Sequence, residues 1–205
     1  MDFVIAICVG VGLSAACGLR VFLPMLLLSA AAKLGVLDLA SGFSWVASWP
    51  ALVAFGVASV LEVGAGHIPW VDHAVDVLAA PCAIAVGTLA MATQLDAAQP
   101  LIGWAGTLAA GGAIGGTIAG GVKLLGATTR VASTASTGGL ANPIIAGVET
   151  LGATVLSILS IVLPIVAGVL LIAIVATAIV LLRRRRARSK AATASAICTP
   201  LRIAA

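Results

Sequence analysis

Residues 143–182 read PIIAGVETLGATVLSILSIVLPIVAGVLLIAIVATAIVLL, and the basic run Arg183–Arg186 follows at once. Glu149 is the single charged residue in this stretch of 40. As one helix the stretch would be about 60 Å long, twice the ~30 Å thickness of a bilayer core. We therefore divide it at Pro164 into two predicted membrane-spanning helices.

The composition of the whole chain is typical of a membrane protein. Of 205 residues, 61% are hydrophobic and 9% are charged, whereas a soluble domain has roughly 25% charged residues. Backbone inside a bilayer must satisfy its own hydrogen bonds, so it is helical or a closed barrel. Because the apolar runs are long and unbroken, the sequence predicts an all-α, polytopic membrane protein.

Six spans are predicted along residues 1–182, the transmembrane domain. The first is a kinked or tilted helix, because Gly18, Arg20 and Pro24 interrupt it. Residues 183–205 are predicted to be a basic, disordered cytoplasmic tail. The expected spans are residues 3–32, 51–66, 75–93, 101–125, 143–163 and 165–182.

The basic residues give the predicted orientation. Seven of the 11 Lys and Arg residues lie in the tail, beside a hydrophobic run, whereas a nucleic-acid protein would spread them over a polar face. Cytoplasmic flanks carry excess Lys and Arg, so the C-terminus is assigned to the cytoplasm. Six spans then place the N-terminus there as well, with residues 33–50 and 96–100 outside. Trp45, Trp49 and Trp104 would mark the outer interface.

Arg20, Glu62 and Glu149 are charged residues that lie within predicted hydrophobic spans. A charge at the centre of a membrane helix costs roughly 2.5–3.5 kcal/mol on insertion scales, so such residues normally face the bundle interior or a water-filled cavity. One interpretation is a polar intramembrane site, in which Arg20 binds an anionic group and the glutamates carry protons or cations. The other is structural: Arg20 pairs with one glutamate, and Glu62 lies at headgroup level.

Asp72, His73 and Asp76 are secondary candidates, as is Arg130 in the polar segment after the fourth span. In a helix, Asp72 and Asp76 share a face beside His73, and such mixed nitrogen and oxygen ligands suit a transition metal. The cluster begins a span, however, where Asp72 would cap the helix. We prefer capping, so no metal or cofactor is predicted.

Gly112, Gly116 and Gly120 recur every four residues, a spacing that lets another helix approach closely. We expect packing within one chain or between two copies, and the alternative is a thin wall along a permeation path. Residues 126–142 are small and rich in hydroxyl groups. We expect a cytoplasmic loop there, and the alternative is a gate that dips into the bilayer.

A loose internal similarity divides the chain in two. In the first half, Arg20 is followed by a span that contains Glu62, 42 residues later. In the second half, Arg130 is followed by a span that contains Glu149, 19 residues later. Three spans per half would make residues 1–95 and 101–182 inverted repeats, an organisation common among transporters. Because the two separations differ, the repeat is a hypothesis.

Several short motifs resemble, in order, a family of small bacterial membrane proteins catalogued as domain of unknown function 4126, over roughly residues 5–180. The resemblance implies a bacterial inner-membrane protein and brings no reaction, substrate or cofactor. The chain departs from the family pattern at Gly66, His67 and Thr150, where an acid, a Lys and an acid are usual. That departure implies weaker cation binding wherever those acids bind a cation in relatives. The motifs are Gly18–Pro24 (GLRVFLP), Trp49-Pro50, Glu62 with Ile68-Pro69, and Gly138–Pro143 (GGLANP) with Glu149.

No serine elbow, HExxH, Walker loop or haem CxxCH motif occurs in the sequence, so we expect no enzyme and no catalytic residues. We expect a small transporter or channel for an unidentified solute or ion, built around Arg20, Glu62 and Glu149. The alternative is a non-transporting assembly factor or accessory subunit that docks through its glycine-rich helix face. The expected partners are the lipid bilayer and a second copy or another membrane protein, and not nucleic acid.

Overall fold

Every regular element in the described part of this computed structural model is a helix, and that part comprises residues 3–65, 69–95, 99–138, 140–169 and 173. The chain divides into two units, Met1–Gly168 and Val169–Ala205, and the elements below belong to the first. The helices are α1 Phe3–Leu19, α2 Leu23–Lys33, the 3-10 helix η1 Ser41–Ala47, α3 Trp49–Ala65, α4 Pro69–Ala92, α5 Gln99–Gly111, the π-helix η3 Gly112–Gly116, α6 Thr117–Thr137 and α7 Asn142–Val162.

The first predicted span is two helices and not one kinked helix. α1 ends at Leu19 and α2 begins at Leu23, because Pro24 lies in the first turn of α2 and its ring does not fit inside a continuous helix. With 17 and 11 residues, the two helices are about 25 and 16 Å long. Neither reaches across a ~30 Å bilayer core.

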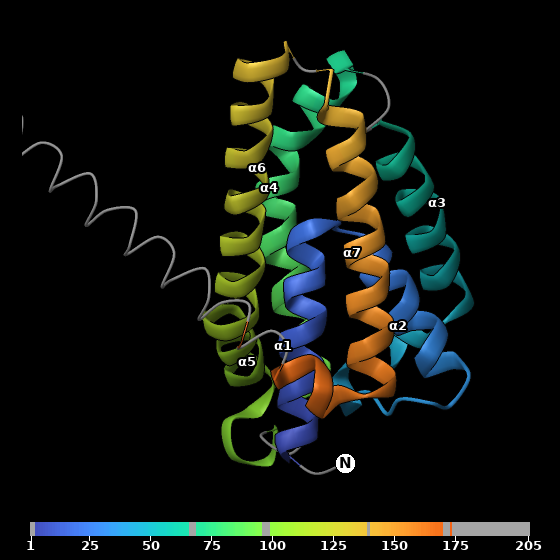
Figure 1. Ribbon diagram of the computed structural model, residues 1–205. Coiled ribbons are helices and arrows are strands. Elements are labelled where there is room, and N and C mark those ends of the chain that lie inside the picture. Colours follow the sequence, from blue (N-terminus) through green and yellow to red (C-terminus); the bar gives the residue numbers. More distant parts are fainter. Residues whose placement is uncertain (1–2, 66–68, 96–98, 139, 170–172, 174–205) are drawn as a thin grey trace, which may run out of the picture. The chain divides into compact units, whose positions relative to one another are not determined.

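α1 and α2 form a hairpin that starts and finishes at the same end of the unit (Figure 1). Gly10, near the middle of α1, lies against Met91 at the end of α4 and against Gln94 just after it. Soon after α2, Ala40 donates its N–H to the carbonyl of Thr93, at that same end of α4, over 2.8 Å. The turn between α1 and α2 therefore lies inside the helical bundle.

The later helices agree with the predicted spans to different degrees. α3 and α7 match spans 51–66 and 143–163 closely, and α7 stops just before Pro164, at Val162. α4 begins at Pro69, six residues before the predicted start at Val75. The described residues contain two continuous helical stretches that are long and apolar enough to cross a bilayer. They are Gly103–Thr137, which runs through α5, η3 and α6, and Asn142–Val162, which is α7. Six spans and two inverted repeats stay predictions, and residues 174–205 lie outside the described residues.

The hydroxyl-rich segment is helical, so the expected loop over residues 126–142 is wrong. α6 continues to Thr137 and ends at Gly138, whose φ of 63° terminates it. Within α6, hydroxyl groups donate to backbone carbonyls three or four residues earlier, which satisfies them without leaving the helix. The donors are Thr128, Thr129, Thr134, Ser136 and Thr137.

Small residues bring the helices around α1 close together. α1 packs against α4, α6 and α7. The predicted glycine face packs within the chain, because Gly116 and Gly120 lie against Ile84 of α4. The closest backbone approach is one residue away from the predicted set, where Gly115 of η3 meets Gly87 of α4.

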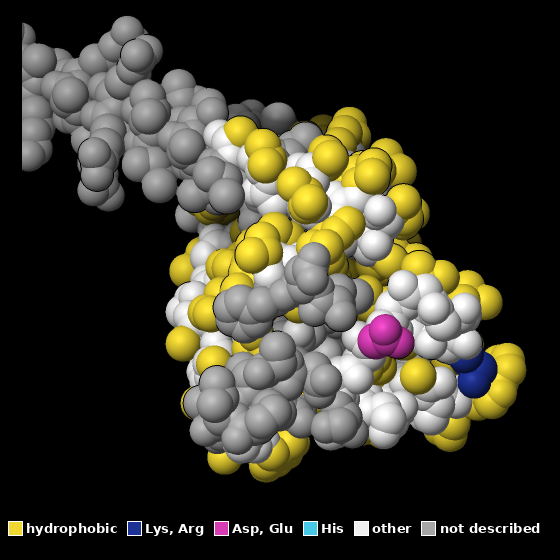
Figure 2. Space-filling model, turned by 90° about the horizontal axis from the view of Figure 1, so that it is seen from below, with side chains coloured by type: hydrophobic (Ala, Val, Ile, Leu, Met, Phe, Trp, Pro, Cys, Tyr) yellow, Lys and Arg dark blue, Asp and Glu magenta, His cyan; other side chains and the backbone are white. Residues whose placement is uncertain are grey.

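The outward face of α7 is apolar, and its polar residues lie on the buried face. On α7 the buried positions include Glu149, Ser157 and Ser160. The opposite face carries exposed aliphatic side chains along its whole length. Figure 2 shows the end of the unit near the N-terminus, where hydrophobic side chains cover most of the described surface. The exposed α7 residues are Ile144, Val148, Leu151, Val155, Ile158 and Val162.

Candidate functional site

Arg20 lies in the turn between α1 and α2 and is 4% exposed. Its guanidinium group reaches two other helices. Nε donates to Thr150 Oγ1 over 3.0 Å, and Nη2 donates to the carbonyl of Ala146 over 3.0 Å, both on α7. Nη1 donates to the backbone carbonyl of Glu62 on α3 over 3.2 Å. All three acceptors are uncharged oxygen atoms.

Glu62 extends from α3 to the same turn, and its carboxylate binds backbone. Oε1 accepts the N–H of Val21 over 2.6 Å, and Oε2 accepts the N–H of Phe22 over 3.0 Å. These two N–H groups precede the first residue of α2, where no intrahelical acceptor exists for them. A carboxylate is favoured at the positive end of a helix, so Glu62 caps α2 from a neighbouring helix.

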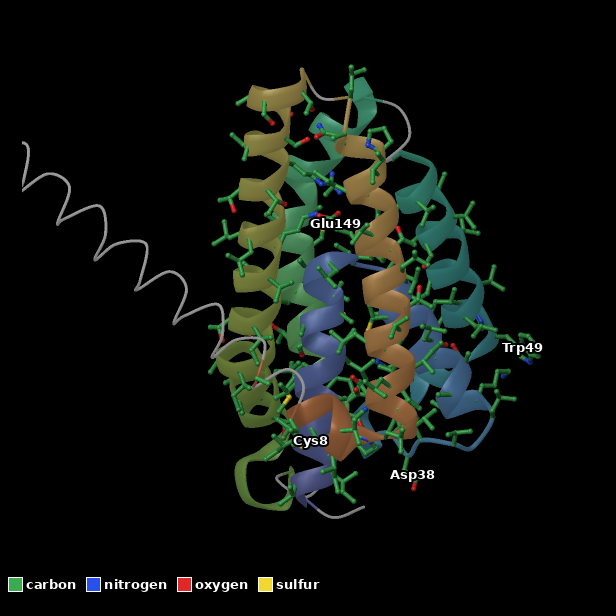
Figure 3. The ribbon with its side chains drawn as sticks, in the orientation of Figure 1. Cys8, Asp38, Trp49 and Glu149 are labelled. Atoms are coloured by element: carbon green, nitrogen blue, oxygen red, sulfur yellow. The ribbon has the colours of Figure 1, made fainter. Side chains whose placement is uncertain are left out.

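Glu149 pairs with Arg130, and not with Arg20. Arg130 Nη2 donates to Glu149 Oε2, which joins α6 to α7. Arg130 and Glu149 are 7% and 9% exposed, and Glu149 points into the bundle between the two helices (Figure 3). Gly126 of α6 leaves room for this carboxylate, because a Cβ atom there would lie 3.0 Å from Glu149 Oε1.

Lys123 is a buried charge that the sequence analysis did not single out. It lies on α6 and is 9% exposed. The signal that would have found it is its spacing: seven residues before Arg130 is two helical turns, so both cations share the inward face of α6.

The model of a family described as a domain of unknown function, DUF4126, matches residues 7–184. The chain belongs to this family. The predicted resemblance over residues 5–180 is thereby confirmed. No curated protein and no solved structure matches the chain.

The hairpin turn of this DUF4126 protein brings together two of the three predicted site residues, Arg20 and Glu62. Glu149 belongs to the same stretch of α7, because Arg20 binds Ala146, three residues before it, and Thr150, directly after it. Glu149 is the eighth of 21 residues in α7, so the polar cluster lies about 10 Å from the Asn142 end of the helix. Gly152, the middle residue of α7, is three positions from Glu149, so the cluster lies about 5 Å from the middle of the helix and is closer to the predicted midplane than to that end.

The secondary candidates differ in what the structure describes. Arg130 joins the polar cluster. Asp72, His73 and Asp76 lie within α4, and their side chains are outside the described residues, as is His67. Because α4 begins at Pro69, Asp72 is its fourth residue and not its cap, so the capping interpretation is wrong. Among the side chains that are described, no three His, Cys, Asp or Glu residues lie together as metal ligands would.

Proposed function

We propose that this DUF4126 protein is a multi-pass protein of the bacterial inner membrane that moves a small solute or ion past a polar cluster. The cluster comprises Arg20, Glu62, Arg130 and Glu149. The observation that carries the proposal is the broken helix: α1 ends and α2 begins inside the bundle, and the turn between them bears Arg20 and is bound by Glu62.

The distribution of side chains supports a membrane location. Charged residues such as Arg20 and Glu149 are buried, while long rows of aliphatic residues are exposed. That arrangement suits hydrocarbon outside and protein inside, the reverse of a soluble domain. Trp45 and Trp49, which flank the start of α3, are exposed, as expected for residues at a membrane interface. Trp49 points away from the bundle in Figure 3.

The broken helix supports a transport role. Non-helical backbone at membrane depth is tolerated where it is buried in protein or lines a water-filled path. In many transporters, broken helices present their free ends and nearby charges to the transported group. The turn Arg20–Phe22 has this form, because it holds two backbone N–H groups and a buried guanidinium group next to each other.

The hairpin also changes the proposed topology. The basic tail is assigned to the cytoplasm and residues 33–50 to the outside. Because α1 starts at the end of the unit where α2 finishes, the N-terminus belongs with residues 33–50 on the outside. The proposed topology therefore has the N-terminus outside and the C-terminus in the cytoplasm, whereas the sequence analysis expected both in the cytoplasm.

The alternative role, an assembly factor that docks through its glycine face, loses its main support. Gly116 is buried against Ile84 and Thr88 of α4 in the same chain. A partner helix would have to displace α4 to reach it.

Flux in proteoliposomes tests the transport proposal. Vesicles with the wild-type protein should take up at least one of acetate, formate, K⁺, Na⁺ or H⁺ faster than empty vesicles. Glu149→Gln should abolish that flux, because it breaks the pair with Arg130, while circular dichroism and elution volume stay unchanged. Gly121→Ala is the matched control, since a Cβ at Gly121 meets nothing within 4 Å. Equal flux in the wild type and Glu149→Gln would contradict the proposal, as would no flux of any probe.

A further inference from the structure

We propose that the turn between α1 and α2 is a binding site for a small carboxylate anion, and that Glu62 occupies this site in the absence of ligand. The inference rests on the proposed function and names the chemical class of its substrate. It comes from two features of the turn, a pair of backbone donors and a buried cation with uncharged partners, and from a buried hydroxyl group without a partner on α3, one helical turn from Glu62.

The backbone donors match a carboxylate in number and position. The N–H groups of Val21 and Phe22 are consecutive, and each binds a different oxygen of the Glu62 carboxylate, over 2.6 and 3.0 Å. Consecutive N–H groups at the start of a helix form an anion-binding concavity. A free carboxylate has the same two oxygens as the glutamate side chain. It can therefore make the same two hydrogen bonds.

Arg20 supplies positive charge next to these donors. It is 4% exposed, and its three hydrogen bonds end on Thr150 Oγ1 and on two backbone carbonyls. The guanidinium group has five N–H donors, so two of them are left after these three bonds. A buried cation with uncharged acceptors favours an anion nearby, and a planar carboxylate suits the fork geometry of arginine.

Ser59 adds a donor that the protein itself does not use. It lies one turn before Glu62 on the same face of α3, is 5% exposed, and its Oγ has no hydrogen-bond partner. Ser133 Oγ of α6 is likewise buried without a partner, whereas Ser157 and Ser160 of α7 each donate to a carbonyl four residues earlier. A buried hydroxyl without a partner is costly. An anion that takes the place of the Glu62 carboxylate would give this hydroxyl an acceptor.

α3 carries both Ser59 and Glu62 and is weakly embedded. Of its 17 residues, Ala51 and Ser59 are the buried ones, so a small displacement of α3 exposes little apolar surface in a membrane. Two carboxylates cannot share one pair of N–H groups, because like charges repel. The ligand therefore replaces Glu62 at Val21 and Phe22, and departure of the ligand lets Glu62 return.

Calorimetric titration of the purified full chain in detergent with formate and acetate tests this exchange. The wild type should bind both weakly, and Glu62→Ala should bind them about tenfold more tightly, because the charged competitor for the charge-assisted bonds is gone. Glu62→Gln should fall between the two. Ser59→Ala, with Glu62 intact, should weaken formate binding a few-fold, and Arg20→Lys should abolish it in the wild type and in Glu62→Ala. Chloride, which has no paired oxygens, is the control anion and should not reproduce these differences.

Two results would overturn the proposal. Formate binding to Glu62→Ala but not to the wild type would make Glu62 a fixed cap. Equal binding by the wild type, Ser59→Ala and Arg20→Lys would place the anion elsewhere. If Glu62→Ala does not fold, the wild-type and Ser59→Ala titrations decide alone. Calorimetry measures binding without flux, so the two proposals can fail separately. Flux of another probe without formate binding would reject the binding site alone. Formate binding without flux of any probe would reject the transport role alone.

Discussion

Two buried arginines of this protein are held in different ways. Arg130 of α6 is bound by a carboxylate, Glu149 of α7. Arg20, in the turn between α1 and α2, is bound by a hydroxyl group and two backbone carbonyls, and its neighbour Glu62 gives its carboxylate to backbone N–H groups instead. Both arginines reach α7, within two turns of each other.

The two arginines therefore have different roles. Arg130 and Glu149 form a clamp, a buried ion pair that joins α6 to α7, whereas Arg20 lies at the proposed anion-binding site. In the Arg130–Glu149 pair each charge is compensated by the other, so the pair joins two long helices and has little need of a further ion. At Arg20 the positive charge is surrounded by uncharged acceptors, and the carboxylate beside it can be replaced. We infer that the Arg130–Glu149 pair holds α6 against α7 at one wall of the polar cluster, and that the hairpin turn and α3 are where a ligand binds.

The largest expected effect breaks the clamp. Arg130→Met leaves Glu149 buried without its partner, and we expect a loss of about 3–5 kcal/mol in unfolding free energy. Arg130→Met/Glu149→Met should recover most of that loss, because well-packed apolar residues tolerate the site. Reversible unfolding in mixed micelles measures both variants. A double variant that is less stable than the single one would show that the pair is not what holds α6 to α7.

A smaller effect is expected at the hairpin turn. Arg20→Lys keeps the charge but loses the fork that reaches α3 and α7, so we expect about 2 kcal/mol of destabilisation in the same assay. Adding Glu62→Gln or Glu149→Gln should not restore stability, because neither carboxylate pairs with Arg20. Recovery on neutralising either glutamate would erase the difference between the two arginines.

The smallest effect concerns the space around Glu149. Gly126→Ala would place a Cβ atom 3.0 Å from Glu149 Oε1, and we expect a loss of about 1 kcal/mol from crowding. Gly121→Ala, on the same helix, meets nothing within 4 Å and should be neutral or stabilising by up to about 1 kcal/mol, since Ala favours helix. Thermal unfolding of the two variants side by side compares them. Equal shifts would mean that the Glu149 carboxylate is free to move.

Local sequence signals predicted the helices whose limits are set locally. α3 begins beside Pro50, and α7 ends at Val162 next to Pro164, both close to the predicted positions, because proline is tolerated in the first turn of a helix and disfavoured in its interior. Pro81 inside α4 is an exception. The hydroxyl-rich part of α6 was misjudged for the converse reason. All of its described Ser and Thr side chains except Ser133 donate to helix carbonyls, so their polarity does not end the helix.

The sequence by itself therefore determined the helical class, the family and the presence of charges among apolar residues, because each is a property of neighbouring residues or of composition. The tertiary structure decided that α1 and α2 turn back inside the bundle, that Glu149 binds Arg130, and that Glu62 caps α2. These choices join residues from 19 to 130 positions apart. Where no water satisfies a buried donor or charge, its partner is whichever group the packed helices bring within reach.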